Sequence, residues 1–341
     1  MNTSSLKKIN INKIVDCLLE KPNSTIAEVA RESNLSIATC GNAINHLLEI
    51  GEAIETDVDR NRGGRPAKRY SINPDFYHIA CLQLYNENQV DYYRYILCDR
   101  VGSILEYSPP TQVTLNMDVI ISKIESLREN DPLIHAIGIG VPAMVYQGNI
   151  GPDCDIKGLC DLDMLGQLKK YFNLHFVIEN DMNLRALGYY ETKVKGQTGN
   201  LVLINLPYQD CVSAGIMIRG RLCKGNDGFS GELSYLPRLR QINEHRKLVT
   251  REPDELVDLL AILCSVIIAT VNPKAIFLMG SDLTQEIIER ADQLCRTKIP
   301  EVHMPDLQMV NDAHDAYKIG LLYKTLNSLG SDRTLRLTPF P

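Results

Sequence analysis

The most chemically suggestive feature of the sequence is a short basic segment near the N-terminus. Residues 60–69 contain five Lys or Arg and no Asp or Glu. Such a density of positive charge suits the phosphate backbone of a nucleic acid, and we expect Arg62, Lys68 and Arg69 to neutralise phosphates. In the Gly-Gly-Arg-Pro sequence at 63–66, the glycines would let the backbone approach DNA closely and the proline would stiffen the segment. Arg65 would then insert into a narrow, electronegative minor groove.

Three predicted helices precede the basic segment. Their apolar residues recur at helical spacing over 7–20, 25–33 and 37–50. Ser24 and Ser36 are predicted to cap the second and third helices through their hydroxyl oxygens. The apolar stripe of the third helix is expected to face the core and consists of Ile37, Ile44, Leu47 and Leu48. The tight turn between the second and third helices predicts a helix-turn-helix.

Two segments that alternate like strands, 53–56 and 69–72, flank the basic segment and make it the wing of a winged helix-turn-helix. In such a domain the third helix lies in the major groove, where short polar side chains read base edges. The candidates outside the apolar stripe are Ser36, Thr39, Asn42 and Asn45. A protein-binding winged helix with a solvated basic loop is the alternative, but charge concentrated at the wing favours DNA.

Composition limits the class of protein. The chain has 341 residues, of which 44% are hydrophobic and 23% charged, as expected for a globular protein of two or three domains. The net charge is −6, yet residues 1–70 hold 10 Lys and Arg against 9 Asp and Glu, so the acidic average does not exclude DNA. The N-terminus lacks an apolar leader, and the longest uncharged apolar run, 259–271, is shorter than the roughly 20 residues that span a bilayer.

The cysteines agree with a cytoplasmic location, which we expect for this protein. The sequence contains ten, and no two form a C-x-x-C pair. A chain of this length buries enough apolar surface to fold without disulfides. We therefore expect free thiols in the core.

From about residue 78 onward, strand-like and helix-like segments alternate, which predicts α/β layers. The strand-like segments are 79–85, 92–98, 134–140, 175–179, 201–205, 211–218 and 275–279. The helix-like segments are 117–129, 161–172, 182–192, 254–271, 282–294 and 312–328. Glycine-bearing turns follow several strands, but a glycine there more often marks a tight turn than a phosphate-binding site.

The order of motifs in this region resembles the ROK family of bacterial repressors and sugar kinases, which are built on a two-lobed actin-like ATPase fold. The motifs are Ile178–Asn183, the Ala214-Gly215 hairpin, Gly225–Leu233 and the segment from Asn272 to Gly280. The resemblance covers about residues 75–330, and the added winged helix with its Gly-Arg-Pro wing matches the repressor branch.

The resemblance implies two domains. The first is a winged helix-turn-helix DNA-binding domain over residues 1–73, and the second is a ROK-type two-lobed α/β sensor domain over 74–341. Lobe 1 is expected over about 74–180 and lobe 2 over about 181–310. The helix at 312–328 is expected to return to lobe 1.

The resemblance also implies a sugar-binding cleft. Asp181 matches the catalytic base of the family's kinases, and Asn180 and Glu232 match other positions that contact the sugar. Asp155 falls where the family often has an Asn that contacts the sugar, and Tyr235 stands where it usually has a His. For Asn180 and Asp181, capping of the helix that follows the strand is the alternative.

Two departures from the family speak against kinase activity. The kinases carry Asp-x-Gly-Gly-Thr in their first hairpin, whereas residues 83–88 here lack glycine, and Glu87 would repel phosphate. The second phosphate loop reads Ser-Ala-Gly at 213–215, where the family tends to have Gly-x-Gly. We therefore predict no catalytic residues, no cofactor and no enzymatic activity.

A structural zinc ion is not expected either. The family's zinc loop supplies several cysteines after its conserved His, but no Cys occurs between Cys223 and Cys264. Tyr235 cannot replace a neutral imidazole in the usual four-coordinate zinc site. We predict that the protein binds no metal.

These features predict a DNA-binding transcriptional regulator, a repressor of carbohydrate uptake or catabolism genes whose kinase-like domain senses a sugar or sugar derivative. Its partner would be a double-stranded operator, bound by a homodimer or a dimer of dimers, because two-fold proteins read paired half-sites. No membrane partner is expected. Two alternatives remain open: a ROK sugar kinase with an appended DNA-binding domain, and a ligand-independent DNA-binding protein with a vestigial sugar site.

The wing provides the first testable prediction. Replacing Arg65 by Ala should weaken binding to operators with A·T-rich flanks more than to operators with G·C-rich flanks, because A·T tracts narrow the minor groove and strengthen its negative potential. Equilibrium titration of both DNAs measures the difference. An equal loss on the two operators would contradict minor-groove insertion.

Overall fold

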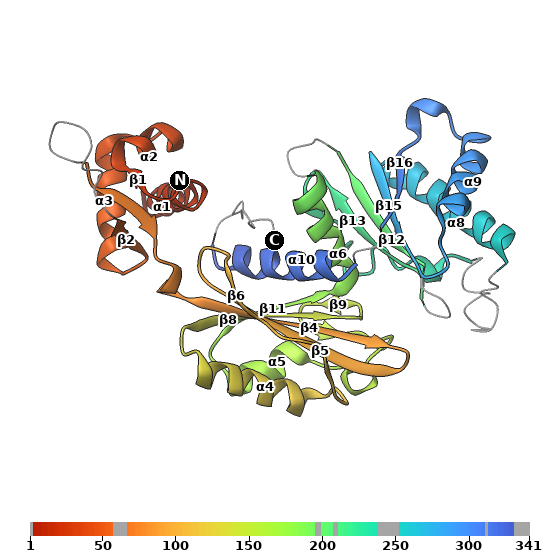
Figure 1. Ribbon diagram of the computed structural model, residues 1–341, viewed down its shortest axis with the longest axis horizontal. Helices are drawn as coiled ribbons and strands as arrows, with labels where there is room; N and C mark the ends of the chain where they lie inside the picture. Colours follow the sequence, from red (N-terminus) through yellow and green to blue (C-terminus); the bar gives the residue numbers. More distant parts are fainter. Residues whose placement is uncertain are drawn as a thin grey trace.

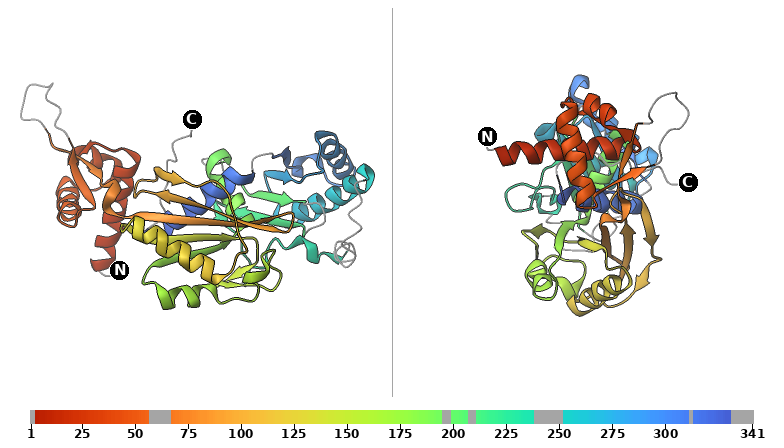
Figure 2. Two further views of the ribbon diagram at one scale, coloured as in Figure 1. Left: turned by 60° about the horizontal axis from the view of Figure 1, so that its bottom comes forward. Right: turned by 90° about the vertical axis from the view of Figure 1, so that its left-hand side faces the viewer.

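The computed structural model describes residues 3–56, 67–194, 199–206, 211–237, 252–310 and 313–330. The molecule is elongated, with a small helical domain at one end and two sheet-containing lobes beyond it (Figure 1). Figure 2 shows the small domain standing clear of the lobes along the long axis. In the part of the chain that the structure describes, no helix has the length and apolar character needed to cross a membrane.

The small domain is a winged helix-turn-helix. Its elements are α1 (Thr3–Glu20), β1 (Ser24–Thr25), α2 (Ile26–Ser33), α3 (Ile37–Glu49), β2 (Ala53–Thr56) and β3 (Arg69–Ile72). Strand β3 pairs antiparallel with both β1 and β2. The three predicted helices and the two predicted strands are confirmed. The basic loop between β2 and β3, with Arg62 and Arg65, lies outside the described residues.

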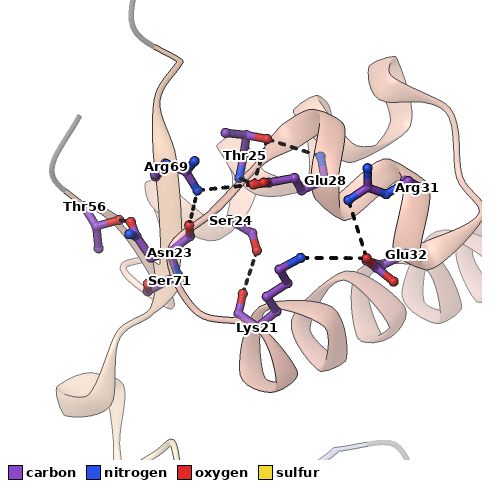
Figure 3. Close-up of polar contacts among 10 residues, drawn as sticks. All are labelled: Lys21, Asn23, Ser24, Thr25, Glu28, Arg31, Glu32, Thr56, Arg69 and Ser71. Carbon is purple, nitrogen blue, oxygen red and sulfur yellow. Dashed lines mark hydrogen bonds and ion pairs between the residues drawn. The ribbon is translucent and has the colours of Figure 1, made fainter. Parts of the chain in front are cut away.

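The predicted cap of α2 is wrong by one residue. Thr25 caps the helix: its hydroxyl oxygen accepts a hydrogen bond from the Glu28 N–H, and the Glu28 carboxylate accepts the Thr25 N–H at 2.8 Å (Figure 3). This reciprocal capping box satisfies two backbone donors at once, which a lone hydroxyl at Ser24 could not do. Ser24 is buried and donates instead to the Lys21 carbonyl oxygen at 2.7 Å.

The prediction that Ile37 faces the core is also wrong. Ile44 and Leu47 are completely buried, whereas Ile37 is 64% exposed. Helical side chains lean toward the N-terminus of their helix, so a residue in the first turn points past the end of the helix. The apolar stripe of α3 therefore reaches the core only from its second turn onward.

Lobe 1 is a six-stranded sheet covered on both faces. Its strands are β4 (His78–Glu87), β5 (Val90–Cys98), β6 (Ile104–Tyr107), β7 (Thr111–Gln112), β8 (Ile134–Val141) and β11 (His175–Asn180), in the order β11-β8-β4-β5-β6 with β7 beside β5. The small hairpin β9 (Val145–Tyr146) and β10 (Asn149–Ile150) follows β8. Helices α4 (Met117–Asn130) and α5 (Met164–Tyr171) cover one face, and α10 (Ala313–Ser328) covers the other.

Lobe 2 repeats this topology with five strands. They are β12 (Leu201–Asn205), β13 (Ser213–Ile218), β14 (Arg221–Leu222), β15 (Ala275–Met279) and β16 (Asp306–Met309), in the order β14-β13-β12-β15-β16. In both lobes the first long strand is central, with an antiparallel neighbour on one side and a parallel neighbour on the other. Helices α8 (Pro253–Val271) and α9 (Gln285–Arg296) cover one face, and α6 (Asp181–Tyr189) the other. This repeat confirms the expected two-lobed α/β fold.

The two lobes meet where α6 crosses α10. Helix α6 packs on β12 and β13 of lobe 2, and α10 packs on β4, β8 and β11 of lobe 1. A Cβ atom at Gly320 would collide with the carbonyl oxygen of Leu184, and one at Gly188 with that of Ala316. The two backbones are therefore in direct contact, which larger residues would prevent.

A buried ion pair joins the small domain to lobe 1. Arg100 lies in the turn after β5, its side chain is fully buried, and its Nη2 donates to Glu52 Oε1 at 2.6 Å. The guanidinium carbon lies 4.9 Å from the centre of the Tyr77 ring. The neighbouring Val101 packs against the core of the winged helix-turn-helix. A turn of lobe 1 thus contributes to the core of the small domain.

The pairing of Glu52 with Arg100 gives a stability prediction. Replacing Glu52 by Ala leaves a buried guanidinium without its carboxylate, which should lower the free energy of unfolding by about 3–5 kcal/mol. Urea denaturation followed by circular dichroism measures this loss. The matched control is Glu55→Ala, which breaks the exposed Glu55–Lys68 pair (2.8 Å) and should cost about 0–1 kcal/mol. Similar losses in the two variants would contradict the assigned role.

Candidate nucleic-acid interface and ligand cleft

The four predicted base-reading residues lie at the start and along one side of α3. Ser36 is the N-cap: its Oγ accepts the Thr39 N–H at 3.1 Å and lies 2.8 Å from the Thr39 hydroxyl. The Ser36 and Thr39 hydroxyls are therefore engaged with one another, whereas Asn42 and Asn45 are exposed farther along the helix. The amide side chains are the stronger candidates for base contacts, because amides hydrogen-bond adenine in the major groove.

Two of the three predicted phosphate ligands, Lys68 and Arg69, lie in the described residues, and both form ion pairs. Arg69 Nη1 donates to the Asn23 carbonyl oxygen at 2.7 Å and lies 3.3 Å from Glu28 Oε2 (Figure 3). Lys68 pairs with Glu55. Arg69 thus ties β3 to the start of α2, and a phosphate would have to compete with a carboxylate for either residue. Phosphate binding by both stays a prediction.

All five predicted ligand-binding residues line one cleft between the lobes. The cleft has a volume of about 100 Å³. Asn180 ends β11 and Asp181 begins α6, while Glu232 and Tyr235 follow β14 in lobe 2. Asp155 comes from the loop after β10, and Asp153, Ser213 and Phe229 complete the polar wall and the rim. Residues more than 75 positions apart in sequence are therefore neighbours, although their binding of a ligand stays a prediction.

The side chain of Asn180 forms hydrogen bonds within the protein. Its Oδ1 accepts the Asn183 N–H at 3.0 Å and caps α6, and its Nδ2 donates to the Ala143 carbonyl oxygen at 2.9 Å. The alternative role as a helix cap is thus realised for Asn180. The next residue, Asp181, pairs instead with Arg185 one turn later, at 3.3 Å.

The cleft is strongly acidic. Asp153, Asp155, Asp181 and Glu232 line it. Burial raises the pKa of Asp181, although Arg185 opposes this shift. Burial and the neighbouring carboxylates of Asp181 and Asp153 raise the pKa of Glu232 to about 7. At neutral pH the cleft therefore combines carboxylates with a carboxyl group that is half protonated, and it can both accept and donate hydrogen bonds.

Aromatic rings form one rim of the cleft. The Tyr235 hydroxyl donates to Asp153 Oδ2 at 2.6 Å, and this hydrogen bond raises the pKa of Tyr235. The Phe229 ring lies 4.9 Å from the Tyr235 ring, and both are more than two-fifths exposed. The rim thus offers an apolar surface beside the polar floor.

A completely buried carboxylate, Glu179, lies beside the cleft and was not predicted from the sequence. Its Oε2 lies 3.0 Å from Lys224 Nζ and 3.1 Å from Lys324 Nζ, and its Oε1 accepts the Asn183 amide at 3.1 Å. Burial opposes ionisation, but the two ammonium groups outweigh it and lower the pKa of Glu179. The available signal was an acidic residue that directly follows three apolar residues of the strand, Phe176, Val177 and Ile178.

The positions that bind phosphate in ROK kinases are occupied by packing contacts here. In the first hairpin, the Tyr85 and Tyr92 rings stack with centroids 5.5 Å apart. In the second, a Cβ at Gly215 would collide with the Met182 carbonyl oxygen, so α6 needs a glycine there. No group of three or more His, Cys, Asp or Glu among the described residues is arranged to hold a metal ion. Residues 238–251, where the family's zinc loop would fall, lie outside that part.

The fold of this protein is a winged helix-turn-helix joined to a two-lobed α/β body, with a polar cleft between the two lobes. Residues 90–245 match the model of the ROK family, and residues 9–51 match that of the winged helix-turn-helix DNA-binding domain. The chain therefore carries a ROK family domain and an N-terminal winged helix-turn-helix, as predicted from the sequence.

Among curated proteins, the chain is similar to the xylose repressor of Caldicellulosiruptor bescii, with 25% identity over 245 residues. This match covers 69% of the chain and 60% of the repressor. The xylose repressor of Bacillus subtilis is 22% identical over 239 residues, which cover 68% of the chain and 61% of the repressor. The chain thus spans about three-fifths of the length of these relatives.

Two solved structures show the same fold. A ROK family transcriptional regulator, described as a homologue of the E. coli MLC protein, superposes with a TM-score of 0.69 at 17% identity and covers 95% of this chain and 99% of its own. The ROK hexokinase of Thermus thermophilus gives a TM-score of 0.57 at 16% identity, over 74% of this chain and 99% of its own.

The raised pKa of Glu232 predicts a pH-dependent stability. A carboxyl group whose pKa is higher in the folded state contributes stability below its unfolded pKa and loses it as the pH rises through its folded pKa, here about 7. Glu232→Gln, which mimics the protonated form, should therefore gain stability relative to the wild type between pH 5 and pH 8. Thermal unfolding across this range measures the gain. Glu286→Gln, a change on the exposed side of α9, should show no such trend.

Proposed function

We propose that this protein is a transcriptional repressor that binds operator DNA through its winged helix-turn-helix and senses a sugar in the cleft between its lobes. The observation that carries the proposal is the buried Glu52–Arg100 pair, which fixes a helix-turn-helix directly to a lobe that forms the cleft. The names of the curated relatives, which are xylose repressors, support the same function.

The cleft favours a neutral, polyhydroxylated ligand. Carboxylates such as Asp181 and Asp155 accept hydrogen bonds from hydroxyl groups, and the Phe229 and Tyr235 rings can cover the apolar face of a sugar ring. A phosphorylated sugar is disfavoured, because its charge would meet several carboxylates. D-xylose is the first effector to test, because the relatives are named for it.

Sugar binding would act by shifting an equilibrium between lobe arrangements. A ligand that contacts Asp181 of α6 together with Asp155 of lobe 1 binds more tightly when these walls approach each other. Only such a difference in affinity can move the equilibrium. In a homodimer or a dimer of dimers, the shift would change the spacing of the paired winged helices and hence the affinity for two half-sites.

We further propose that the protein is not an enzyme. Proton acceptance by Asp181 is useless for phosphoryl transfer without a bound donor, and the two phosphate-binding hairpins are used for packing. A ROK kinase with an added DNA-binding domain is the competing function. ADP release with a panel of sugars distinguishes them, because turnover above background would support the kinase.

The proposal predicts loss of induction on mutation of Asp181. Operator DNA selected from random sequence by the full chain should bind the wild type, and D-xylose or another neutral sugar in a panel of mono- and disaccharides should release it. In Asp181→Ala and Asp181→Asn, half-maximal release should need about tenfold more sugar or more, which is the range for a lost hydrogen bond to a charged group. Fluorescence anisotropy measures the release.

The matched control is Asp118→Asn, on the exposed side of α4 and away from the cleft, which should leave the release unchanged. Unchanged release in both Asp181 variants would contradict the proposed pocket. If the wild type binds DNA but no sugar releases it or raises its melting temperature, the vestigial-site alternative holds instead.

A further inference from the structure

The start of α3 carries an apolar side chain that the core does not use. Ile37 is 64% exposed, more than any other large apolar side chain in the described part of the winged helix-turn-helix. It follows the N-cap Ser36 directly and therefore lies in the first turn of the helix. An isoleucine in this position gains from the hydrophobic effect only when a partner covers it.

The surroundings keep this side chain open. Residues four apart share one side of a helix, so Ile37, Gly41 and Asn45 form a row. Because side chains lean toward the N-terminus, a side chain at 41 would lie over Ile37, and glycine removes that cover. The fold itself does not require this glycine: a Cβ there would meet only Ile26 Cδ1, at an ordinary 3.9 Å.

A close approach of α3 to a base edge explains both the exposed Ile37 and the glycine at position 41. In helix-turn-helix proteins the N-terminal residues of the second helix of the motif contact bases in the major groove. The apolar group exposed there is the C5-methyl of thymine. We propose that Ile37 packs against a thymine methyl in each half-site and that Gly41 lets α3 lie close enough for this contact. The inference rests on the proposed function, because it takes α3 as the DNA-reading helix.

The amide side chains of Asn42 and Asn45 also favour contact with A·T base pairs. Asn42 and Asn45 are exposed, and Asn45 shares the row of Ile37 and Gly41. Asparagine pairs with the N6 and N7 atoms of adenine. An A·T pair presents the adenine edge and the thymine methyl side by side in the major groove. We therefore expect A·T pairs in the half-site beneath the first turns of α3.

Replacement of single thymines by deoxyuridine tests the proposal, because it removes the methyl group and keeps base pairing. With the full wild-type chain on its selected operator, one thymine in each half-site should be sensitive, and its replacement should weaken binding about fourfold, as expected for one apolar carbon group. Ile37→Ala should bind the thymine operator about as weakly and lose the sensitivity at that position. Ile37→Val should be intermediate.

Two controls separate this contact from others. Ile50→Ala makes the same change at the opposite end of α3, where Ile50 is 46% exposed, and should keep the full sensitivity to deoxyuridine. Replacing adenines by 7-deazaadenine removes an acceptor that asparagine uses. Ile37→Ala should keep its sensitivity to this change, whereas Asn42→Ala or Asn45→Ala should lose it.

Gly41→Ala tests the second part of the proposal. It should keep or slightly raise the melting temperature of the wild type, because alanine favours the helix more than glycine does. It should weaken operator binding, because the added methyl group holds α3 away from the bases. Unchanged affinity would overturn the role of Gly41. If deoxyuridine is tolerated at every position while the operator is still bound, the role of Ile37 is overturned and the proposed function stands. If the chain selects no DNA sequence, both fall.

Discussion

The rest of this structure depends on the crossing of α6 and α10, where backbone meets backbone. Each helix covers the sheet of a different lobe, and the two helices pack closely against one another where the lobes meet. Gly188 and Gly320 allow this contact. Because α6 starts at the floor of the cleft, the same crossing fixes where Asp181 and Arg185 lie.

A continuous set of contacts extends from the cleft to the DNA-binding domain. Arg185 stacks on the Tyr317 ring of α10, whose hydroxyl donates to the Leu84 carbonyl oxygen of β4. Strand β4 pairs with β5, and the turn after β5 carries Arg100, which pairs with Glu52. These contacts hold the cleft and the helix-turn-helix together in one body.

Regular periodicity and local motifs were predictable from the sequence, and contacts between distant residues were not. The helix predicted over 254–271 is α8, and the strand over 79–85 is β4, because long apolar repeats leave few alternatives. The family resemblance also placed five distant residues in one cleft. The predictions for Ser24 and Ile37 were wrong because both residues lie at the ends of helices. At a helix end a neighbouring residue can supply the cap instead, and the first turn can lie beyond the edge of the core. Glu179 and Arg100 were missed because their partners lie far away in sequence.

By itself, the sequence determined the winged helix-turn-helix, the α/β layers and the loss of the phosphate-binding glycines, since each depends on residue type and spacing within a short segment. Only the tertiary structure decided which polar groups are free to act. Asn180 is committed to capping α6 and Arg69 to Glu28, and Ile37 is exposed. The pKa of Glu232 is raised to about 7 by its burial and by the neighbouring carboxylates of Asp181 and Asp153. The physical reason is that burial, charge pairing and exposure are set by neighbours that the chain brings together only when it folds.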